Sequence, residues 1–437
     1  MYFRKRILTY FNLKYKVSKS GLKGEILIPA SKSHTIRAIS IAAMANGKSV
    51  LKNPLVSADA LSCVAGAIEL GAKIETGTDY IVEGIGGSFS SAKKKVDVGN
   101  SGTSLRILTA LASLGNHIVE FDGDSSIRKR PMTPLLSALE NLGAKINSTG
   151  GKCPFTIEGP IKGGKTTVNG ISSQFLTALL IACPLAEGDS EIIVENLHEQ
   201  PYVEITLDWL KKQNVQYGHK NLDWFKIKGN QSYKPFDGQI PADFSSATFA
   251  LCAAAITKSE ILVKGLDFTD SQGDKVVFNH LEKMGVKLTH TPNGVLVTPG
   301  LLRGIEIDMN ATPDALPALA VTACFAEGTT KLLNVKQARL KECDRIAAMN
   351  TELTKLGAKV TELEDGLIIE KSKLTPTACH GYDDHRMVMA LSLAGMGCEG
   401  TLEVDTAEAV GITYPTFVDD FSSLGAKIEK MEKWKNG

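Results

Sequence analysis

A repeated helix ending is the feature that most constrains how this chain can fold. The motif Leu-Gly-Ala-Lys recurs along the chain with small changes, and one glycine or asparagine marks each copy. The six markers are spaced by 72, 71, 71, 72 and 68 residues: Gly71, Gly143, Asn214, Gly285, Gly357 and Gly425. Glycine and asparagine most readily adopt the left-handed conformation that closes a helix. The sequence therefore predicts six structural repeats.

The same order of elements is predicted in every repeat. A short strand leads into a small polar cluster and an Ala/Leu-rich helix, and a β-rich stretch, a second helix and a hairpin follow. Each unit is therefore βαβαββ. The sixth unit ends soon after Lys427 without its full hairpin, while a surplus strand-like segment lies at 15–29. We expect that N-terminal strand to complete the last unit.

Three units in each half predict an α/β fold of two similar domains. Residues 31–241 form one domain, and residues 1–30 with 242–437 form the other, with crossovers near Pro29 and Pro241. Both helices of each unit are apolar over much of their surface, as expected of buried helices. We therefore predict helices packed inside and sheets outside, an inside-out α/β barrel, with the active site in the cleft between the domains.

Composition narrows the class of protein. The 437 residues are 43% hydrophobic and 22% charged, with a net charge of +1, so neither disorder nor a general basic field for nucleic acid is expected. The chain has no apolar run of 18 residues and no signal-peptide pattern, so no membrane partner is expected. Its eight cysteines are scattered singly, as in a reduced cytoplasmic protein without a zinc site.

Basic residues gather near the polar clusters that begin the first helices. A helix N-terminus offers free N–H groups and partial positive charge, and therefore attracts anions. Cations there oppose the helix dipole, so local stability does not explain them. Singly, each basic residue is better interpreted as a surface salt bridge, but together they favour a site for a small molecule with several negative charges. They are Lys32, Arg37, Arg106, Arg128, Lys129, Arg130, Lys341, Arg345 and Arg386.

Acidic residues lie among these cations, notably Asp314, Glu342 and Asp384. Each can be a helix cap, or a general base if it faces a bound hydroxyl. The sequence has no nucleophile motif and no Walker loop. We therefore expect acid–base and electrostatic catalysis without a metal or cofactor.

Eight motifs in order carry a family resemblance: SKSHTIRA, GNSGTSLR, KRPM, SSQFLTALL, QPY, PDA, LKECDR and DDHRM. Through them, the chain resembles the 5-enolpyruvylshikimate-3-phosphate (EPSP) synthase family from about residue 14 to residue 432. The resemblance implies two domains of three βαβαββ units and a cytoplasmic monomer without cofactor. It also implies transfer of the enolpyruvyl group of phosphoenolpyruvate to the 5-hydroxyl of shikimate 3-phosphate, in aromatic amino acid biosynthesis. The resemblance further implies that addition gives a tetrahedral intermediate, from which phosphate is then eliminated.

The same resemblance assigns roles to residues. Asp314 engages the 5-hydroxyl, and Glu342 and Lys32 are candidates for proton transfer at the phosphoenolpyruvate methylene. The residues implied for shikimate 3-phosphate are Lys32, Ser33, Arg37, Ser172, Ser173, Gln174, Tyr202, Asp314, Gln337 and Lys341. Those implied for phosphoenolpyruvate are Lys32, Gly102, Arg130, Gln174, Arg345 and Arg386.

The sequence departs from the family pattern at three positions. Glu199 stands where serine is common, Gln337 where the family has an asparagine, and Ile412 where it has a lysine that contacts phosphoenolpyruvate. Loss of that lysine predicts a raised KM for phosphoenolpyruvate and weaker inhibition by glyphosate, unless Ile412 simply packs away from the site.

Three alternatives remain open. The UDP-N-acetylglucosamine enolpyruvyl transferases share the fold, but the loop at 123–131 lacks their reactive cysteine. A weakened paralogue that binds shikimate 3-phosphate but turns over slowly would fit Glu199 and Ile412. A purely structural repeat protein would not need the clustered acids and bases.

Overall fold

The computed structural model describes residues 11–87 and 94–434, which form two compact units. The C-terminal unit comprises Met1–Ile28, Phe244–Leu266 and Asp274–Gly437, and the N-terminal unit comprises Pro29–Asp243 and Asp267–Gly273. Residues 1–10, where a signal peptide would begin, lie outside the described part.

Every sheet formed by the described residues has four strands in one shared order, in which a parallel pair is followed by two antiparallel pairings. In the N-terminal unit the first sheet is β14 (Asp237–Gln239), β3 (Lys48–Lys52), β5 (Tyr80–Glu83) and β4 (Lys73–Glu75). The second is β6 (Lys94–Asp97), β7 (Val119–Asp122), β9 (Phe155–Glu158) and β8 (Lys145–Ser148). The third is β10 (Gly164–Asn169), β11 (Ser190–Glu195), β13 (Trp224–Ile227) and β12 (Tyr217–Lys220).

The C-terminal unit repeats this order in three sheets. The first is β2 (Gly24–Leu27), β15 (Ile261–Lys264), β17 (Gly294–Thr298) and β16 (Lys287–Thr291). The second is β18 (Glu306–Asp308), β19 (Thr329–Leu333), β21 (Gly366–Glu370) and β20 (Lys359–Leu363). The third is β22 (Ala378–Cys379), β23 (Thr401–Val404), β1 (Phe11–Ser18) and β24 (Lys427–Trp434). The mixed α/β class is confirmed, but the sheets are separate and open, so no closed barrel is present in the described chain.

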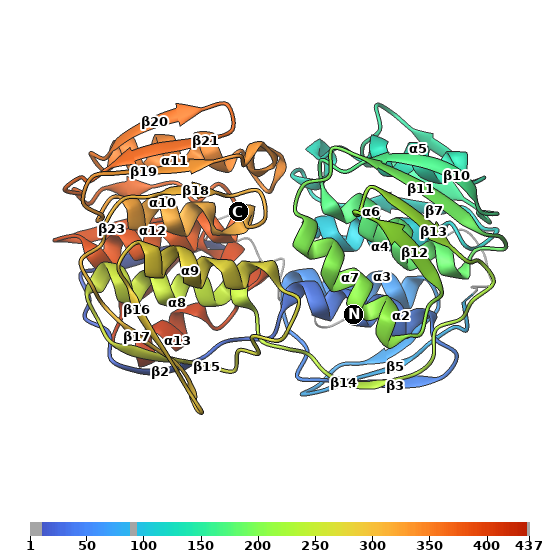
Figure 1. The fold of residues 1–437 in the computed structure, drawn as a ribbon, viewed down its shortest axis with the longest axis horizontal. Helices are drawn as coiled ribbons and strands as arrows, with labels where there is room; N and C mark the ends of the chain where they lie inside the picture. Colours follow the sequence, from blue (N-terminus) through green and yellow to red (C-terminus); the bar gives the residue numbers. More distant parts are fainter. Residues whose placement is uncertain (1–10, 88–93, 435–437) are drawn as a thin grey trace. The chain divides into compact units, whose positions relative to one another are not determined.

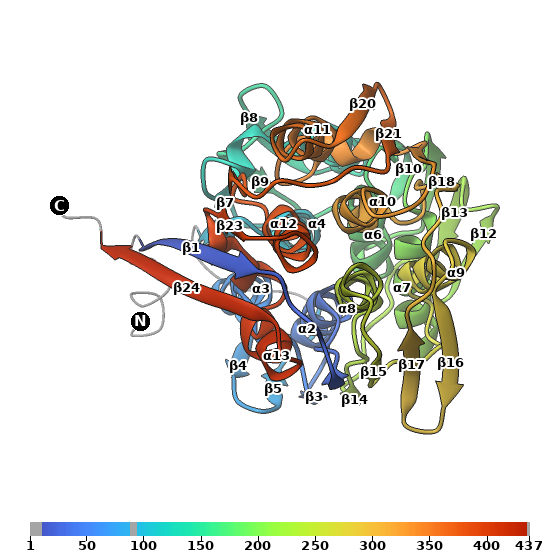
Figure 2. The same ribbon diagram turned by 90° about the vertical axis from the view of Figure 1, so that its left-hand side faces the viewer.

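Strand β1 takes the place of the last hairpin strand in the sixth unit. It pairs antiparallel with β23 and, over its whole length, with β24, from Phe11 opposite Trp434 to Ser18 opposite Lys427. Figure 2 shows the two long strands side by side. Residues at opposite ends of the chain therefore build one sheet.

Two leading strands are exchanged between the units, each just before one of the predicted crossovers near Pro29 and Pro241. Strand β2 precedes a helix of the N-terminal unit but pairs with β15 in the C-terminal unit. Strand β14 precedes a helix of the C-terminal unit but pairs with β3 in the N-terminal unit. The crossover segments meet at a bridge between Ala30 and Ala242.

The first helix of each repeat is buried along nearly its whole length. These helices are α2 (Lys32–Met44), α4 (Gly102–Ala112) and α6 (Ser173–Ala182), and then α8 (Phe244–Thr257), α10 (Leu316–Ala323) and α12 (His385–Gly397). Within the C-terminal unit, α8, α10 and α12 pack against one another (Figure 1). None of the helices in the described part is long and apolar enough to span a membrane.

The second helices end at the predicted markers, but each buries only one face, so the expectation that both helices of a unit are buried is wrong for them. They are α3 (Ala58–Glu69), α5 (Thr133–Asn141), α7 (Gln200–Lys212), α9 (Val276–Lys283), α11 (Arg345–Lys355) and α13 (Phe417–Ser423). All six marker residues have positive φ, from 55° at Asn214 to 119° at Gly71, so the predicted helix endings are confirmed.

The sequence analysis placed segment Asp267–Gly273 in the domain that contains residues 242–437. It groups instead with the N-terminal unit. The Gln272 side chain donates to the Ala242 carbonyl at 2.9 Å, and Asp270 contacts His34 at 3.1 Å. These polar contacts tie the segment to the residues around α2.

Candidate active site

Arg345, the first residue of α11, lies at the centre of a charged network in the C-terminal unit. Its side chain is 1% exposed. The guanidinium Nη1 donates to Asp314 at 2.8 Å, and Nη2 donates to Glu342 at 2.8 Å. Asp384, which caps α12, receives Nε at 2.8 Å and Nη2 at 3.2 Å. Burial disfavours the charge, but the attraction of these three carboxylates outweighs it and raises the pKa of Arg345 well above its ordinary value.

Asp314 lies in a short 3-10 turn before α10 and meets two further cations. Arg386 Nη2 lies 3.0 Å from one carboxylate oxygen, and Lys341 Nζ lies 3.8 Å from the other. The Asp314 side chain is 15% exposed, so the group is mostly shielded from water but accessible at one side. Five of the predicted site residues are thus in direct contact: Asp314, Lys341, Glu342, Arg345 and Arg386.

Gln337 of the same unit stands apart from this network. Its amide Nε2 donates to the Asn310 carbonyl at 3.0 Å. Its carbonyl Oε1 is buried and has no hydrogen-bond partner among the described residues. An unmet buried acceptor is costly, and this oxygen is one of several such atoms in the described part of the chain.

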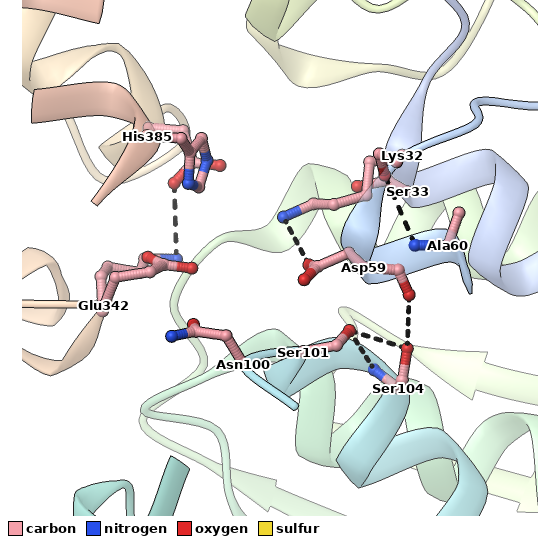
Figure 3. Close-up of polar contacts among 12 residues, drawn as sticks. Lys32, Ser33, Asp59, Ala60, Asn100, Ser101, Ser104, Glu342 and His385 are labelled. Atoms are coloured by element: carbon pink, nitrogen blue, oxygen red, sulfur yellow. Dashed lines mark hydrogen bonds and ion pairs between the residues drawn. The ribbon is translucent and has the colours of Figure 1, made fainter. Parts of the chain in front are cut away.

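In the N-terminal unit, Lys32 and Ser33 begin α2. Lys32 Nζ lies 3.4 Å from Asp59 Oδ2, with both side chains largely buried. Ser101 caps α4 and donates to Ser104, whose hydroxyl donates to the Asp59 carbonyl oxygen at 3.2 Å (Figure 3). Asp59 therefore joins Lys32 to the start of α4. The sequence analysis missed it, although a serine two residues before an acid at a helix start is a recognisable signal.

Arg37 is 2% exposed and is largely engaged with the protein itself. It donates to Thr206 and to Thr177, and also to the carbonyl oxygens of Ser33 and Tyr202, at 2.9 to 3.2 Å. Burial lowers its pKa to about 10. Arg37 thus links α2 to α6 and α7 and fixes the backbone of two other predicted site residues.

The carboxylate of Glu199 lies at the N-terminus of α6. Ser172 caps this helix by accepting from the Gln174 N–H. The Ser173 hydroxyl donates to Glu199 Oε2 at 2.8 Å, and the Ser173 N–H donates to the same oxygen at 3.3 Å. Glu199 is 2% exposed and has a left-handed backbone with φ of 57°. The Gln174 side chain accepts from Arg106 at 3.0 Å.

Two arginines converge on the start of α4, where Gly102 is the first residue. A Cβ at Gly102 would lie 2.3 Å from Arg106 Nη1 and 2.8 Å from Arg130 Nη1, so a side chain here would displace both. Arg130 also donates to Asn100 at 2.7 Å and to Ser126 at 3.2 Å. Glycine at this position allows two guanidinium groups to approach one helix N-terminus.

A family model described as EPSP synthase (3-phosphoshikimate 1-carboxyvinyltransferase) matches residues 17–421. The chain belongs to this family. It is 50% identical over 420 residues to the 3-phosphoshikimate 1-carboxyvinyltransferase of Acetivibrio thermocellus, covering 95% of this chain and 99% of the relative. It is 42% identical over 432 residues to that of Methanosarcina acetivorans, covering 96% and 100%. A solved EPSP synthase structure from Acinetobacter baumannii aligns with a TM-score of 0.79 at 27% identity, covering 96% of this chain and 100% of that one.

Proposed function

We propose that this chain transfers the enolpyruvyl group of phosphoenolpyruvate to the 5-hydroxyl of shikimate 3-phosphate and releases phosphate. The observation that carries the proposal is the match to the family over residues 17–421, which takes in residues of both compact units. The step belongs to the shikimate pathway of aromatic amino acid biosynthesis, and both substrates are small polyanions.

The chemistry needs one oxygen–carbon bond to form and another to break. The 5-hydroxyl oxygen attacks C2 of phosphoenolpyruvate while C3 gains a proton, which gives a tetrahedral intermediate. The bond to phosphate then breaks, C3 loses a proton and the enol ether forms. We assign Asp314 to the hydroxyl proton, and Glu342 and Lys32 to the protons at C3. In support, the cations around Asp314 balance its negative charge while the carboxylate accepts a hydrogen bond from the hydroxyl.

We assign binding roles to the charged groups of both units. Arginine fits carboxylate and phosphate oxygens in pairs, which supports Arg130, Arg345 and Arg386 as the phosphoenolpyruvate side, with Lys32, Gly102 and Gln174. For shikimate 3-phosphate we propose Lys32, Ser33, Arg37, Ser172, Ser173, Gln174, Tyr202, Asp314, Gln337 and Lys341.

Further features of the protein belong to the same proposal. We propose a cytoplasmic monomer that works without metal or cofactor, in which the buried first helices form the interior of each domain and the sheets its outside. Eight cysteines that are all free support a reducing compartment.

A coupled assay of phosphate release tests the function. Purified protein receives phosphoenolpyruvate with either shikimate 3-phosphate or UDP-N-acetylglucosamine as the acceptor. We expect phosphate release only with shikimate 3-phosphate. Release with UDP-N-acetylglucosamine would support the sister activity instead. Binding of shikimate 3-phosphate without turnover would support the weakened paralogue suggested by Glu199 and Ile412.

A further inference from the structure

Glu352, a carboxylate outside the charged network, bonds to the loop at residues 380–383. This loop leads directly into two members of the network, Asp384 and Arg386. Glu352 lies on α11, and its side chain is fully buried. Its Oε2 accepts from the His380 backbone N–H at 3.1 Å, and its Oε1 accepts from the Tyr382 hydroxyl at 2.9 Å. The Lys355 ammonium lies 2.7 Å from Oε1. A buried carboxylate needs such partners, but its two contacts with one loop are not explained by charge compensation alone.

The loop that Glu352 holds has an unusual backbone. Tyr382 and Asp383 are consecutive non-glycine residues with φ of 58° and 53°. Such residues are disfavoured in the left-handed region and persist where surrounding contacts determine the conformation. Burial and the Glu352 carboxylate raise the pKa of Tyr382 to about 12, so its hydroxyl remains a donor at neutral pH.

The opposite side of the loop is fixed by residues that follow β23. Asp405 Oδ1 accepts from the Gly381 N–H at 2.9 Å and lies 2.7 Å from His380 Nδ1. The Asp383 N–H donates to the Thr406 hydroxyl at 3.2 Å. A Cβ on Gly381 would lie 2.5 Å from that hydroxyl oxygen. The loop is therefore closely held between the end of β23 and α11.

The chain leaves this loop directly into the charged network. Asp384 and Arg386 are the next functional residues, one bonded to Arg345 and the other 3.0 Å from Asp314. Arg345 and Glu352 both lie on α11, seven residues apart, so they face the same side of the helix two turns from each other. Helix α11 thus bonds to the segment His380–Arg386 at two positions, through Arg345 and through Glu352.

We propose that Glu352 is a positioning residue for Arg386 and Asp384. Through His380 and Tyr382 it sets the conformation in which the following turn presents the Arg386 guanidinium. Glu352 bonds to His380, Tyr382 and Lys355, none of which is assigned to a substrate. The inference rests on the proposed function only in its prediction that phosphoenolpyruvate binding is affected, because Arg386 is assigned to that substrate.

Substitutions at Glu352 and Tyr382 test the proposal by steady-state kinetics. Glu352→Ala removes both contacts with the loop, and we expect it to raise KM for phosphoenolpyruvate about tenfold or more, with KM for shikimate 3-phosphate within about twofold. Tyr382→Phe removes one contact and gives a smaller rise in the same constant. Glu352→Gln keeps an acceptor and recovers part of the loss. Glu370→Gln, at an exposed carboxylate on β21, is the matched control and changes neither constant.

A role in stability alone would give a different result. If Glu352 only stabilised the fold, a smaller fraction of the Glu352→Ala protein would be folded. The apparent kcat would then fall while both KM values stayed unchanged, and that outcome overturns the proposal. If Glu352→Ala does not fold, Tyr382→Phe decides, and an unchanged KM for phosphoenolpyruvate in that variant overturns it equally.

Hydrogen exchange separates this inference from the function it builds on. Loss of the Glu352 carboxylate should speed amide exchange in residues 380–386, with the His380 amide affected directly. Unchanged exchange in a folded Glu352→Ala protein contradicts the positioning role. A wild-type protein that shows no turnover contradicts the proposed function, and the exchange result still decides whether Glu352 holds the loop.

Discussion

Asp314 is the residue at which three cationic side chains meet one carboxylate. Arg345, Arg386 and Lys341 lie within 2.8 to 3.8 Å of its oxygens. Asp314→Asn keeps the size of the side chain but removes the charge and the basic oxygen, so we expect kcat to fall about 10²-fold or more, as for a lost general base. The measurement is kcat at saturating substrates, with the melting temperature as a control for folding. A variant with near wild-type turnover would leave Asp314 as a structural partner of Arg345.

Glu199 supplies a negative charge where the proposed function places a phosphate. Its carboxylate already uses the N–H and hydroxyl of Ser173 at the start of α6. Glu199→Ser removes this competition, and we expect KM for shikimate 3-phosphate to fall by about tenfold for each ~1.4 kcal/mol regained. Unphosphorylated shikimate as a competitive inhibitor shows whether the gain depends on the phosphate. Glu204→Ser, on the exposed face of α7, serves as the control, and an equal gain for shikimate would contradict the competition.

Ile412 lies in a 3-10 turn, Ala407–Ile412, that packs against β1 and α12. Its side chain is 8% exposed, which favours the packing alternative over the missing-cation hypothesis. A lysine there would place an ammonium group at a buried position, which is costly. We therefore expect Ile412→Lys to lower the melting temperature and to leave KM for phosphoenolpyruvate unimproved, while Ile412→Leu changes neither. A lowered KM in a stable Ile412→Lys protein would restore the missing-cation hypothesis.

At the scale of elements, local signals were predictable and long-range pairings were not. Gly71 and Asn214 close helices through their own backbone preferences, so the sequence alone located them. Strands β2 and β14 have four and three residues, and no local signal tells which distant strand each will join. Likewise, the motifs indicated Arg345 and Asp314, whereas the role of Glu352 depends on a loop 28 residues away along the chain.

The contact between α2 and segment Asp267–Gly273 makes stability depend on pH. Trp209 Nε1 donates to His34 Nδ1, so His34 Nε2 carries the proton and donates to Asp270. Burial raises the pKa of Asp270, but the bond to His34 outweighs it, and the pKa lies below its ordinary value. The ionised carboxylate therefore stabilises the folded state above an unfolded pKa of about 3.9, and this contribution is lost as pH falls through the folded value.

Asp270→Ala should reveal that dependence. We expect a lower melting temperature than wild type at pH 7, with a loss of about 1.5–3 kcal/mol for a charge-assisted hydrogen bond. The difference should shrink as pH falls below about 4, because the unfolded chain then binds a proton at Asp270, and it should disappear at the lower pH where folded Asp270 also becomes neutral. Asp267→Ala, in the same segment, is the matched control. A difference that stays constant from pH 7 to pH 3.5 would show that the Asp270 charge does not stabilise the fold.

At the scale of the whole molecule, the strand topology predicts that one unit can fold as a separate fragment and the other cannot. Residues 29–243 contain every strand of the three N-terminal sheets. Residues 244–437 lack β1 and β2, and with them the buried side chains of Tyr15, Val17 and Ile26. Each such side chain contributes about 1.5–3 kcal/mol when buried, and their sum is comparable with the 5–15 kcal/mol that typically stabilises a domain. The C-terminal fragment should therefore be unable to fold by itself.

A permuted fragment tests this expectation. Because Phe11 lies opposite Trp434 in the antiparallel pairing of β1 and β24, a short Gly/Asn loop can join residue 434 to residue 11 as a hairpin. We expect the chain 244–434 followed by 11–28 to unfold cooperatively and to show dispersed amide resonances. The plain fragment 244–437 should show neither property, and 29–243 should fold without any addition. Cooperative unfolding of the plain fragment would mean that β1 and β2 are dispensable. A permuted fragment that stays unfolded would mean that the C-terminal unit needs the other unit to fold.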